Sequence, residues 1–326
     1  GNRDEISGFP VYKALLCEVI KIEDGTDATR CPVSGDATVC GAPPEVAEFA
    51  QAKPERRVYL DNNATTRMTG AVREAMLPYL EEEHGNPSSI HTLGREARHG
   101  IERARRQVAL LLNASPRRIV FTGGGSESDN LALKGIALAR REQGNHIVTS
   151  AVEHPAVLRT CEFLERNGCK VTYLGVDDYG LVDPQKLQEA ITDATILVSI
   201  MMANNEVGTI QPIKTLCAVA HRKGALFHTD AVQAAGKIPI RVEELEVDLL
   251  TVSGHKFHGP KGVGALYVRQ RDRLAPLVLG AAHEGGLRPG TENVASIVGL
   301  GAACGLARQQ LAERNGRLRS LRDDLW

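Results

Sequence analysis

The chain has 326 residues, enough for about two domains, and its 42% of hydrophobic residues support a sizeable core. Lys plus Arg number 39 and Asp plus Glu 40, so the net charge of −1 predicts neither nucleic acid nor an anionic membrane surface as a partner. No apolar run has transmembrane length, and the N-terminal residues lack the apolar region of a signal peptide.

The seven cysteines favour a reducing compartment. Their number is odd, and no CxxC pair is present. A large chain with this pattern is typical of the cytoplasm, with free thiols rather than a disulfide framework. The cysteines are Cys17, Cys31, Cys40, Cys161, Cys169, Cys217 and Cys304.

Residues 1–56 differ from the rest. Asp24 to Pro44 is rich in Asp, Gly, Thr, Ser and Pro without a sustained period, which predicts an extension or linker whose role is unknown. Its three cysteines leave a metal site open, but their spacing matches no common one.

Two helices are predicted next. Thr69 can cap a helix that runs to about Glu83, with a kink at Pro78. After the loop 85–89, apolar residues recur every three or four positions from Ala97 to Leu111, which indicates an amphipathic helix. We expect its arginines to form a solvated face: Arg98, Arg103, Arg105 and Arg106.

The chain then alternates between short apolar strands and helices. This order predicts an α/β fold with a mainly parallel sheet covered by helices on both faces. The expected strands are 119–121, 146–150, 170–174, 196–200, 226–229, 248–252 and 263–268. The expected helices are 127–141, 156–167, 184–191 and 213–223.

Polar residues follow the predicted strands. Ligands of parallel sheets bind outside the carboxyl ends of the strands. The groups at those ends therefore converge on one rim: 122–126, 153–154, 204–206, 228–233 and 253–256.

The run Thr122-Gly-Gly-Gly-Ser126 joins a strand to a helix and indicates a phosphate site. Glycines let the backbone approach an anion, and the first helical turn offers free N–H groups. A tight turn without a ligand is the competing interpretation. A nucleotide triphosphate is disfavoured because Walker spacing is absent, and the run 299–304 lacks the third glycine of a dinucleotide fingerprint.

Lys256 lies between the apolar runs 248–252 and 263–268. An amine near buried strands is desolvated, which favours its neutral, nucleophilic form. Taken alone, it could be a surface lysine of a hairpin. A lysine, a phosphate site and a carboxylate together indicate pyridoxal 5′-phosphate, with Lys256 as the Schiff-base residue and Asp230 as the partner of the ring nitrogen.

Other rim residues have possible roles at the same cofactor. His154 could stack on the ring or move a proton, and Asn205 and Gln233 could hold the ring hydroxyl. Two of the residues have a competing interpretation when taken alone: Asp230 as a helix cap and His154 as a satisfied loop residue. No metal site is predicted, because HExxH is absent and the pair His255 and His258 lacks a third ligand nearby.

From Val58 to Glu313 the sequence resembles the cysteine desulfurases of the NifS/IscS type, which are class V aminotransferase-like enzymes of fold type I. The matching motifs are YLDNNATT at 59–66, HGNPSSIH at 84–91, FTGGGSES at 121–128, VEH at 152–154, ANNEVG at 203–208, HTDAVQ at 228–233, SGHK at 253–256 and RPGTEN at 288–293.

The resemblance implies a role for each matching residue. Lys256 binds the cofactor covalently, Asp230 pairs with the ring nitrogen and His154 stacks on the ring. The remaining contacts are Gln233 and Asn205 at the ring and its hydroxyl, and Gly125, Ser126, Ser253 and His255 at the phosphate. Thr291 reaches the phosphate of the partner subunit in a homodimer.

The resemblance also implies a domain division. Residues 57–70 lead in from a small domain, 71–293 form the large cofactor-binding domain, and the helix 294–326 opens a small C-terminal domain. In the family that domain carries the persulfide-forming cysteine and the arginine for the substrate carboxylate. Neither has a counterpart here, and residues 126 and 280–286 also depart from the usual pattern.

The expected function is a pyridoxal-phosphate-dependent cysteine desulfurase acting on L-cysteine, with a sulfur-acceptor protein as partner. Two alternatives stay open: a selenocysteine lyase, and a catalytically incomplete cofactor-binding subunit. A nucleotide-binding module is a weaker third. We expect residues 1–326 alone to bind the cofactor but to release almost no sulfide.

Overall fold

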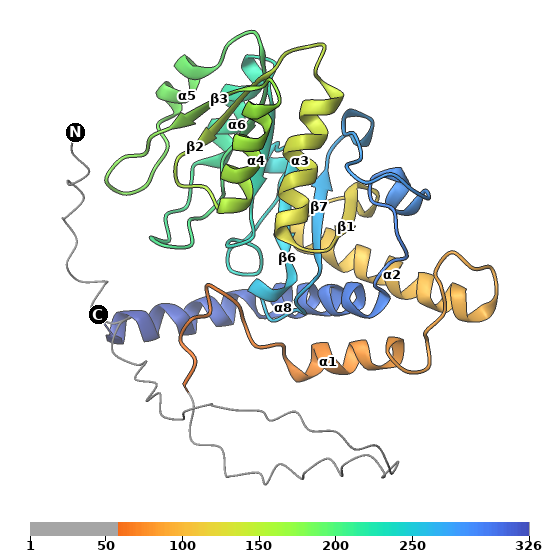
Figure 1. The fold of residues 1–326 in the computed structure, drawn as a ribbon. Coiled ribbons are helices and arrows are strands. Elements are labelled where there is room, and N and C mark those ends of the chain that lie inside the picture. Colours follow the sequence, from red (N-terminus) through yellow and green to blue (C-terminus); the bar gives the residue numbers. More distant parts are fainter. Residues whose placement is uncertain (1–57, 326) are drawn as a thin grey trace, which may run out of the picture. The chain divides into compact units, whose positions relative to one another are not determined.

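The computed structural model describes residues 58–325, which belong to one compact unit (Figure 1). The predicted extension 1–56, with Cys17, Cys31 and Cys40, lies outside the described residues. The division of 57–326 into three parts stays a prediction.

A seven-stranded sheet runs through this unit in the order β1-β7-β6-β5-β4-β2-β3. β2, β3, β4, β5 and β6 are mutually parallel, whereas β7 is antiparallel to both of its neighbours, β6 and β1. The mainly parallel sheet expected from the alternation is therefore confirmed. The strands are β1 Ile119–Thr122, β2 His146–Ser150, β3 Lys170–Leu174, β4 Thr195–Ser199, β5 Leu226–Asp230, β6 Leu249–Ser253 and β7 Gly264–Val268.

Helices cover both faces of the sheet. Successive strand residues point to opposite faces, so each strand feeds two apolar layers. In β1, Val120 packs with α3 and α4, whereas Ile119 and Phe121 pack in the layer that contains α2, α6 and α8. The α-helices are α1 Gly70–Met76, α2 Thr92–Leu112, α3 Gly125–Ala139, α4 Pro155–Arg166, α5 Pro184–Ala190, α6 Ile213–Arg222, α7 Val242–Leu245 and α8 Val294–Leu325.

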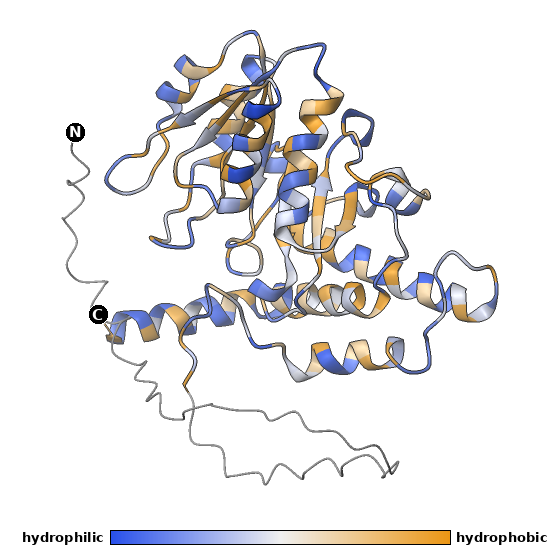
Figure 2. Ribbon diagram, viewed as in Figure 1, coloured by the Kyte–Doolittle hydropathy of each residue, from blue (hydrophilic) through white to orange (hydrophobic). Residues whose placement is uncertain are grey.

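The long helix α8 is buried only in its first half. Its buried residues end at Ala307, and Figure 2 shows that the part beyond is largely hydrophilic. Small residues allow α8 to approach α2 closely: a Cβ on Gly301 would lie 2.6 Å from the Cβ of Ala104. Within residues 58–325, no helix combines the length and the apolar character that a membrane crossing needs.

Two predictions about the helices are wrong in part. The helix capped by Thr69 ends at Met76, and Pro78 lies in a separate 3-10 turn, Leu77–Tyr79, because proline disrupts the α-helical hydrogen bonds. Arg105 does not belong to a solvated face. It is 8% exposed, because the carboxylate of Glu284 compensates its charge inside the protein.

Candidate active site

One cavity of about 250 Å³ lies at the carboxyl ends of the central strands. It brings together every site residue predicted from the sequence except Thr291. The lining consists of Ala64, Gly125, Ser126, Asp129, His154, Met201, Asn205, Asp230, Val232, Gln233, Ser253, His255 and Lys256. Parallel topology is the reason: residues far apart in sequence follow strands that end at the same edge.

The glycine loop forms one wall and opens α3. Gly124 has φ of 152°, a conformation that side chains disfavour, and no side chain caps the helix. A Cβ on Gly125 would lie 3.0 Å from the side chain of Val232, so the backbone itself borders the cavity. The first-turn N–H groups of α3 lack intrahelical acceptors and therefore favour an anion at this point.

Arg288 and Glu127 stabilise the glycine loop through the backbone of Gly123. Glu127 accepts from the backbone N–H of Gly123 at 2.8 Å and from Arg288 Nε at 2.9 Å. The carboxylate is thereby engaged on both oxygens. Thr291 lies in a separate cavity of about 150 Å³ that Gly123 and Arg288 also line.

Lys256 ends a 3-10 turn, Gly254–Lys256, that follows β6. Its Nζ donates to the backbone oxygen of Asn63 at 2.6 Å. Burial lowers the pKa of the Lys256 amine, and the charges of Asp230 and Asp61 oppose that shift. The amine is therefore closer to its nucleophilic form than a surface lysine.

Asp230 ends β5 on the opposite wall. It is 4% exposed, and its Oδ1 accepts from the backbone N–H of Val232 at 2.8 Å. Burial raises the pKa of Asp230, whereas the Val232 hydrogen bond and the charges of His154 and Lys256 act in the other direction. A buried carboxyl that borders a cavity is suited to pair with a cationic group of a ligand.

Two more buried carboxyls surround Asp230, and sequence reasoning did not single them out. Asp129 lines the cavity, and its Oδ1 has no hydrogen-bond partner among residues 58–325. Burial, followed by the charge of Asp230, raises the pKa of Asp129 well above its usual range. Burial raises the pKa of Glu153 to about 8, and Ser150 and the Met201 backbone hold its Oε1. A pKa of about 8 keeps Glu153 predominantly protonated at neutral pH, and burial likewise disfavours the charged form of Asp129.

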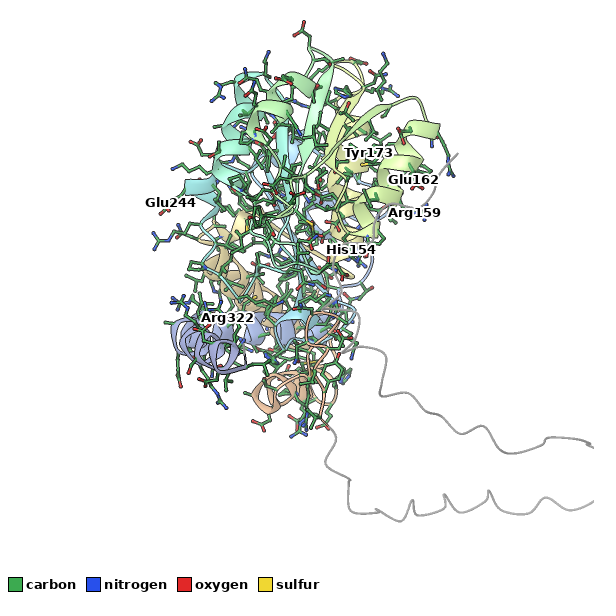
Figure 3. All side chains as sticks on the ribbon, turned by 90° about the vertical axis from the view of Figure 1, so that its left-hand side faces the viewer. His154, Arg159, Glu162, Tyr173, Glu244 and Arg322 are labelled. Atoms are coloured by element: carbon green, nitrogen blue, oxygen red, sulfur yellow. The ribbon has the colours of Figure 1, made fainter. Side chains whose placement is uncertain are left out.

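His154 is the N-cap of α4. Its Nδ1 accepts from the backbone N–H of Ala156 at 3.1 Å, which leaves Nε2 free of that contact. Figure 3 shows His154 nearer to α8 than Arg159, Glu162 and Tyr173 on the same side of the molecule. The exposed imidazole lies at the mouth of the cavity.

The segment 61–66 covers the Lys256 turn. Thr66 donates through its hydroxyl to the backbone oxygen of His255 at 2.7 Å, and Thr65 Oγ1 lies 3.1 Å from His255 Nδ1. His255 is thus engaged by residues about 190 positions earlier. The sequence marked 61–66 only as a turn and as part of the family pattern, so the role of Asn63 was missed.

No cysteine and no arginine line the cavity within residues 58–325. Cys161, Cys217 and Cys304 are buried in the helices α4, α6 and α8. Burial raises the pKa of Cys161 and of Cys217 to about 12, and it raises that of Cys304 further. These thiols are not nucleophiles at neutral pH.

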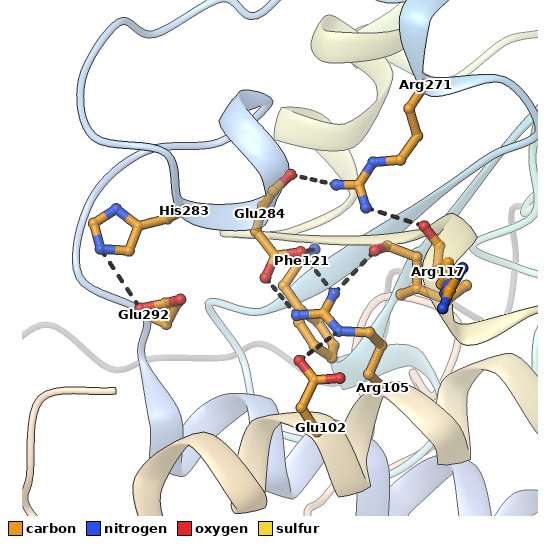
Figure 4. Close-up of polar contacts among 9 residues, drawn as sticks. Glu102, Arg105, Arg117, Phe121, Arg271, His283, Glu284 and Glu292 are labelled. Atoms are coloured by element: carbon orange, nitrogen blue, oxygen red, sulfur yellow. Dashed lines mark hydrogen bonds and ion pairs between the residues drawn. The ribbon is translucent and has the colours of Figure 1, made fainter. Parts of the chain in front are cut away.

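A larger cavity, about 640 Å³, lies beside Arg105 and His283. The charged residues of this cavity stabilise the fold by pairing with one another. Figure 4 shows Arg105 in a bidentate ion pair with Glu284, whose backbone oxygen also accepts from Arg271. It contains no lysine and no strand-end carboxylate. The smaller cavity at Lys256 is therefore the candidate active site.

Comparison with known proteins agrees with this geometry. The Aminotransferase class-V family matches residues 58–323. The chain belongs to this family. Its relatives include a protein named cysteine desulfurase IscS from Methanosarcina thermophila, 54% identical over 270 residues that cover 83% of this chain and 67% of the relative. A second, from Dictyoglomus turgidum, bears the same name and is 53% identical over 269 residues, 82% of this chain and 68% of the relative.

Solved structures show the same fold. One called a NifS-like protein superposes with a TM-score of 0.81 at 45% identity, over 82% of this chain and 74% of that protein. Another, described as SspA in complex with cysteine, has a TM-score of 0.74 at 46% identity, over 76% of this chain and 72% of the other. The expected relation to the NifS/IscS type and the fold type are confirmed.

Proposed function

We propose that this chain is a pyridoxal-phosphate-dependent cysteine desulfurase that removes sulfur from L-cysteine. The observation that carries the proposal is the convergence of a desolvated lysine, a buried carboxyl and an uncapped helix N-terminus on one cavity. The names of the relatives support the reaction, and the complex of SspA with cysteine supports the substrate.

The residues of the cavity fit pyridoxal phosphate. The glycine loop, with Ser126, Ser253 and His255, would hold the phosphate through N–H and O–H donors. Asp230 lies across the cavity from Lys256 and would hold a proton on the ring nitrogen. The bound cofactor supplies an electron sink for the substrate.

The remaining residues would orient and protonate. Lys256 would hold the cofactor covalently, because its partly desolvated amine is the nucleophile of the site. His154, at the mouth, would cover the ring face and move a proton through its free nitrogen. Asn205 and Gln233 would contact the ring hydroxyl. Burial disfavours the charged forms of Asp129 and Glu153, whereas the Val232 hydrogen bond and the charges of His154 and Lys256 favour the charged form of Asp230, which suits Asp230 to the ring nitrogen.

Sulfur transfer needs a further group. The sulfur of the substrate must pass to a thiolate, and a cation must hold the substrate carboxylate. Residues 58–325 supply neither at the cavity lining. We propose that the described residues perform the cofactor half of the reaction and that the thiol comes from elsewhere, with a sulfur-acceptor protein as the next partner.

We further propose that the chain forms a homodimer in a reducing compartment. Thr291 lies outside the cavity of its own protomer, which agrees with a role at the partner's phosphate in a homodimer. The four cysteines within residues 58–325 are free thiols, which favours a reducing compartment such as the cytoplasm.

Spectroscopy with L-cysteine tests the function. The chain loaded with pyridoxal phosphate should show a saturable change in its visible spectrum with L-cysteine, and Lys256→Ala should abolish it. An equal change with L-serine, or none with L-cysteine, would argue for a cofactor-binding subunit without this substrate. L-selenocysteine as the preferred ligand would indicate a selenocysteine lyase.

A further inference from the structure

A second lysine lies behind the cavity wall. Lys237 lies in the turn segment that follows β5 and is partly buried. Its Nζ donates a hydrogen bond to Oε1 of Gln233 at 2.7 Å. It does not line the cavity itself, and no step described above uses it. Lys237 can nevertheless influence the site, because Gln233, which it contacts, lines the cavity.

The two ends of the Gln233 amide face different partners. Nε2 donates to the backbone oxygen of Asn63 at 3.0 Å, and the same oxygen accepts from Lys256 at 2.6 Å. A lysine ammonium can only donate, and a carbonyl oxygen can only accept. One orientation of the amide therefore satisfies both ends, with the oxygen toward Lys237 and the NH₂ group toward Asn63.

The turn that carries Gln233 and Lys237 is fixed on two sides. Asn315 of α8 donates to the backbone oxygen of Lys237 at 2.9 Å. Gly236 has φ of 71°, and a Cβ there would lie 2.8 Å from the Cβ of Phe257, the residue after Lys256. Lys237 is thus anchored to the same backbone that presents Lys256.

The charge of Lys237 is sensitive to the site. Burial, followed by the charge of Lys256, lowers the pKa of Lys237 to about 8. The neutral amine keeps two N–H donors, so the contact with Gln233 persists in both protonation states. A neutral amine could also accept, but the carbonyl of Asn63 can only accept and therefore favours the same orientation of the amide in both protonation states.

We propose that Lys237 is a positioning residue of the cofactor site, which holds the Gln233 amide with its NH₂ group toward Asn63 and Lys256. The inference rests on the proposed function, because it assigns Gln233 a donor at the cofactor. Without Lys237 the amide keeps only its contact with the backbone oxygen of Asn63, so it rotates more readily and an acceptor can replace that donor.

A double-mutant cycle tests this role. The variants are Lys237→Met, Gln233→Ala and the double substitution, and the readout is the pH midpoint of the visible absorbance of bound pyridoxal phosphate. Loss of a donor to the ring oxygen should raise the midpoint by about half a pH unit or more in Lys237→Met. Most of that shift should vanish in the Gln233→Ala background.

Lys214→Met, an exposed lysine on α6, is the matched control and should leave the midpoint unchanged. An equal shift in both backgrounds, or no shift in Lys237→Met, would overturn the positioning role. If Lys237→Met does not fold, Lys237→Gln replaces it, because its shorter side chain cannot keep the 2.7 Å contact; its shift should have the same sign.

The cofactor-free chain separates this inference from the proposed function. If the wild-type chain fails to bind pyridoxal phosphate, the function proposal fails by itself. The melting temperatures of the same four proteins still test the contact, because both single substitutions remove the hydrogen bond between Lys237 and Gln233 and their losses should not add fully. Additive losses would contradict the inference.

Discussion

The side-chain nitrogen of Lys256 donates a 2.6 Å hydrogen bond to the backbone oxygen of Asn63, 193 residues earlier in the chain. This contact closes the cavity with a segment that precedes the first helix. It also holds the amine in place before any cofactor binds, so the lysine loses less conformational freedom on reaction.

Replacement of Asp230 by Asn should weaken the binding of pyridoxal phosphate roughly 100-fold or more, because loss of one partner of a buried ion pair costs about 3–5 kcal/mol. Absorbance titration of the cofactor-free protein measures this. Asp129→Asn is the matched control: burial and the charge of Asp230 disfavour the ionised form of that carboxyl, so its amide should bind almost as well as wild type. Equal losses in both variants would show that the two carboxyls share the ring nitrogen.

Glu153 should make the protein less stable as pH rises. Burial raises its folded-state pKa from 4.5 to about 8, so the folded state holds the proton more tightly than the unfolded state. This contribution is complete below pH 4.5 and is lost between pH 4.5 and 8, with a slope of up to about 1.4 kcal/mol per pH unit.

Urea unfolding of Glu153→Gln at pH 5.5 and pH 7.5 measures that slope. The amide imitates the protonated acid, so the variant should gain stability relative to wild type at the higher pH. Glu313→Gln, an exposed residue on α8, should keep the wild-type dependence. A parallel loss of stability in wild type and Glu153→Gln would mean that Glu153 is ionised in the folded protein.

The buried ion pair between Arg105 and Glu284 should be costly to break. Figure 4 shows that neighbouring groups form further hydrogen bonds with both side chains. The two carboxylate oxygens of Glu284 accept hydrogen bonds from the guanidinium of Arg105 at 2.7 and 2.8 Å. Oε2 of Glu284 also accepts from the backbone N–H of Phe121. Arg105→Met should therefore cost about 3–5 kcal/mol in urea unfolding, since it leaves a buried charge without its partner.

The double variant Arg105→Met/Glu284→Leu should recover part of that loss, because it removes both charges. Arg241→Met, which breaks an exposed pair with Glu244, is the control and should change stability little. Stability of Arg105→Met equal to wild type would show that the pair contributes nothing.

The described thiols should react slowly with iodoacetamide at pH 7.5. Cys161, Cys217 and Cys304 are buried with raised pKa values, whereas Cys169 is partly exposed. Peptide mapping of the native protein should show label at Cys169 first, and the other three only after unfolding. Rapid labelling of Cys304 would make it a candidate sulfur carrier.

Sequence patterns predicted the sheet well because most strands are short runs of apolar and β-branched residues, and β2 and β3 begin and end where expected. The cavity residues followed from topology, since parallel strands place their ends together. Arg105 was misjudged because a buried arginine and a solvated one share the same helical spacing. Its partner Glu284 lies 179 residues away.

Asn63 and Asp129 were missed for a related physical reason. Asn63 contributes a backbone oxygen, which carries no sequence signature. Asp129 is one polar position in the first turns of α3, and only the fold shows that this position faces the cavity. Local patterns predict elements, whereas contacts between distant segments depend on packing that no local pattern encodes.

The position of the covalent link is the decisive measurement for this active site. The chain loaded with pyridoxal phosphate is reduced with borohydride, digested and mapped by mass spectrometry. We expect loss of the visible band and a single pyridoxyl label on Lys256, with no label in Lys256→Ala. A label on Lys237, on Lys261 or on another lysine would contradict the assignment of the cavity at Lys256 as the active site.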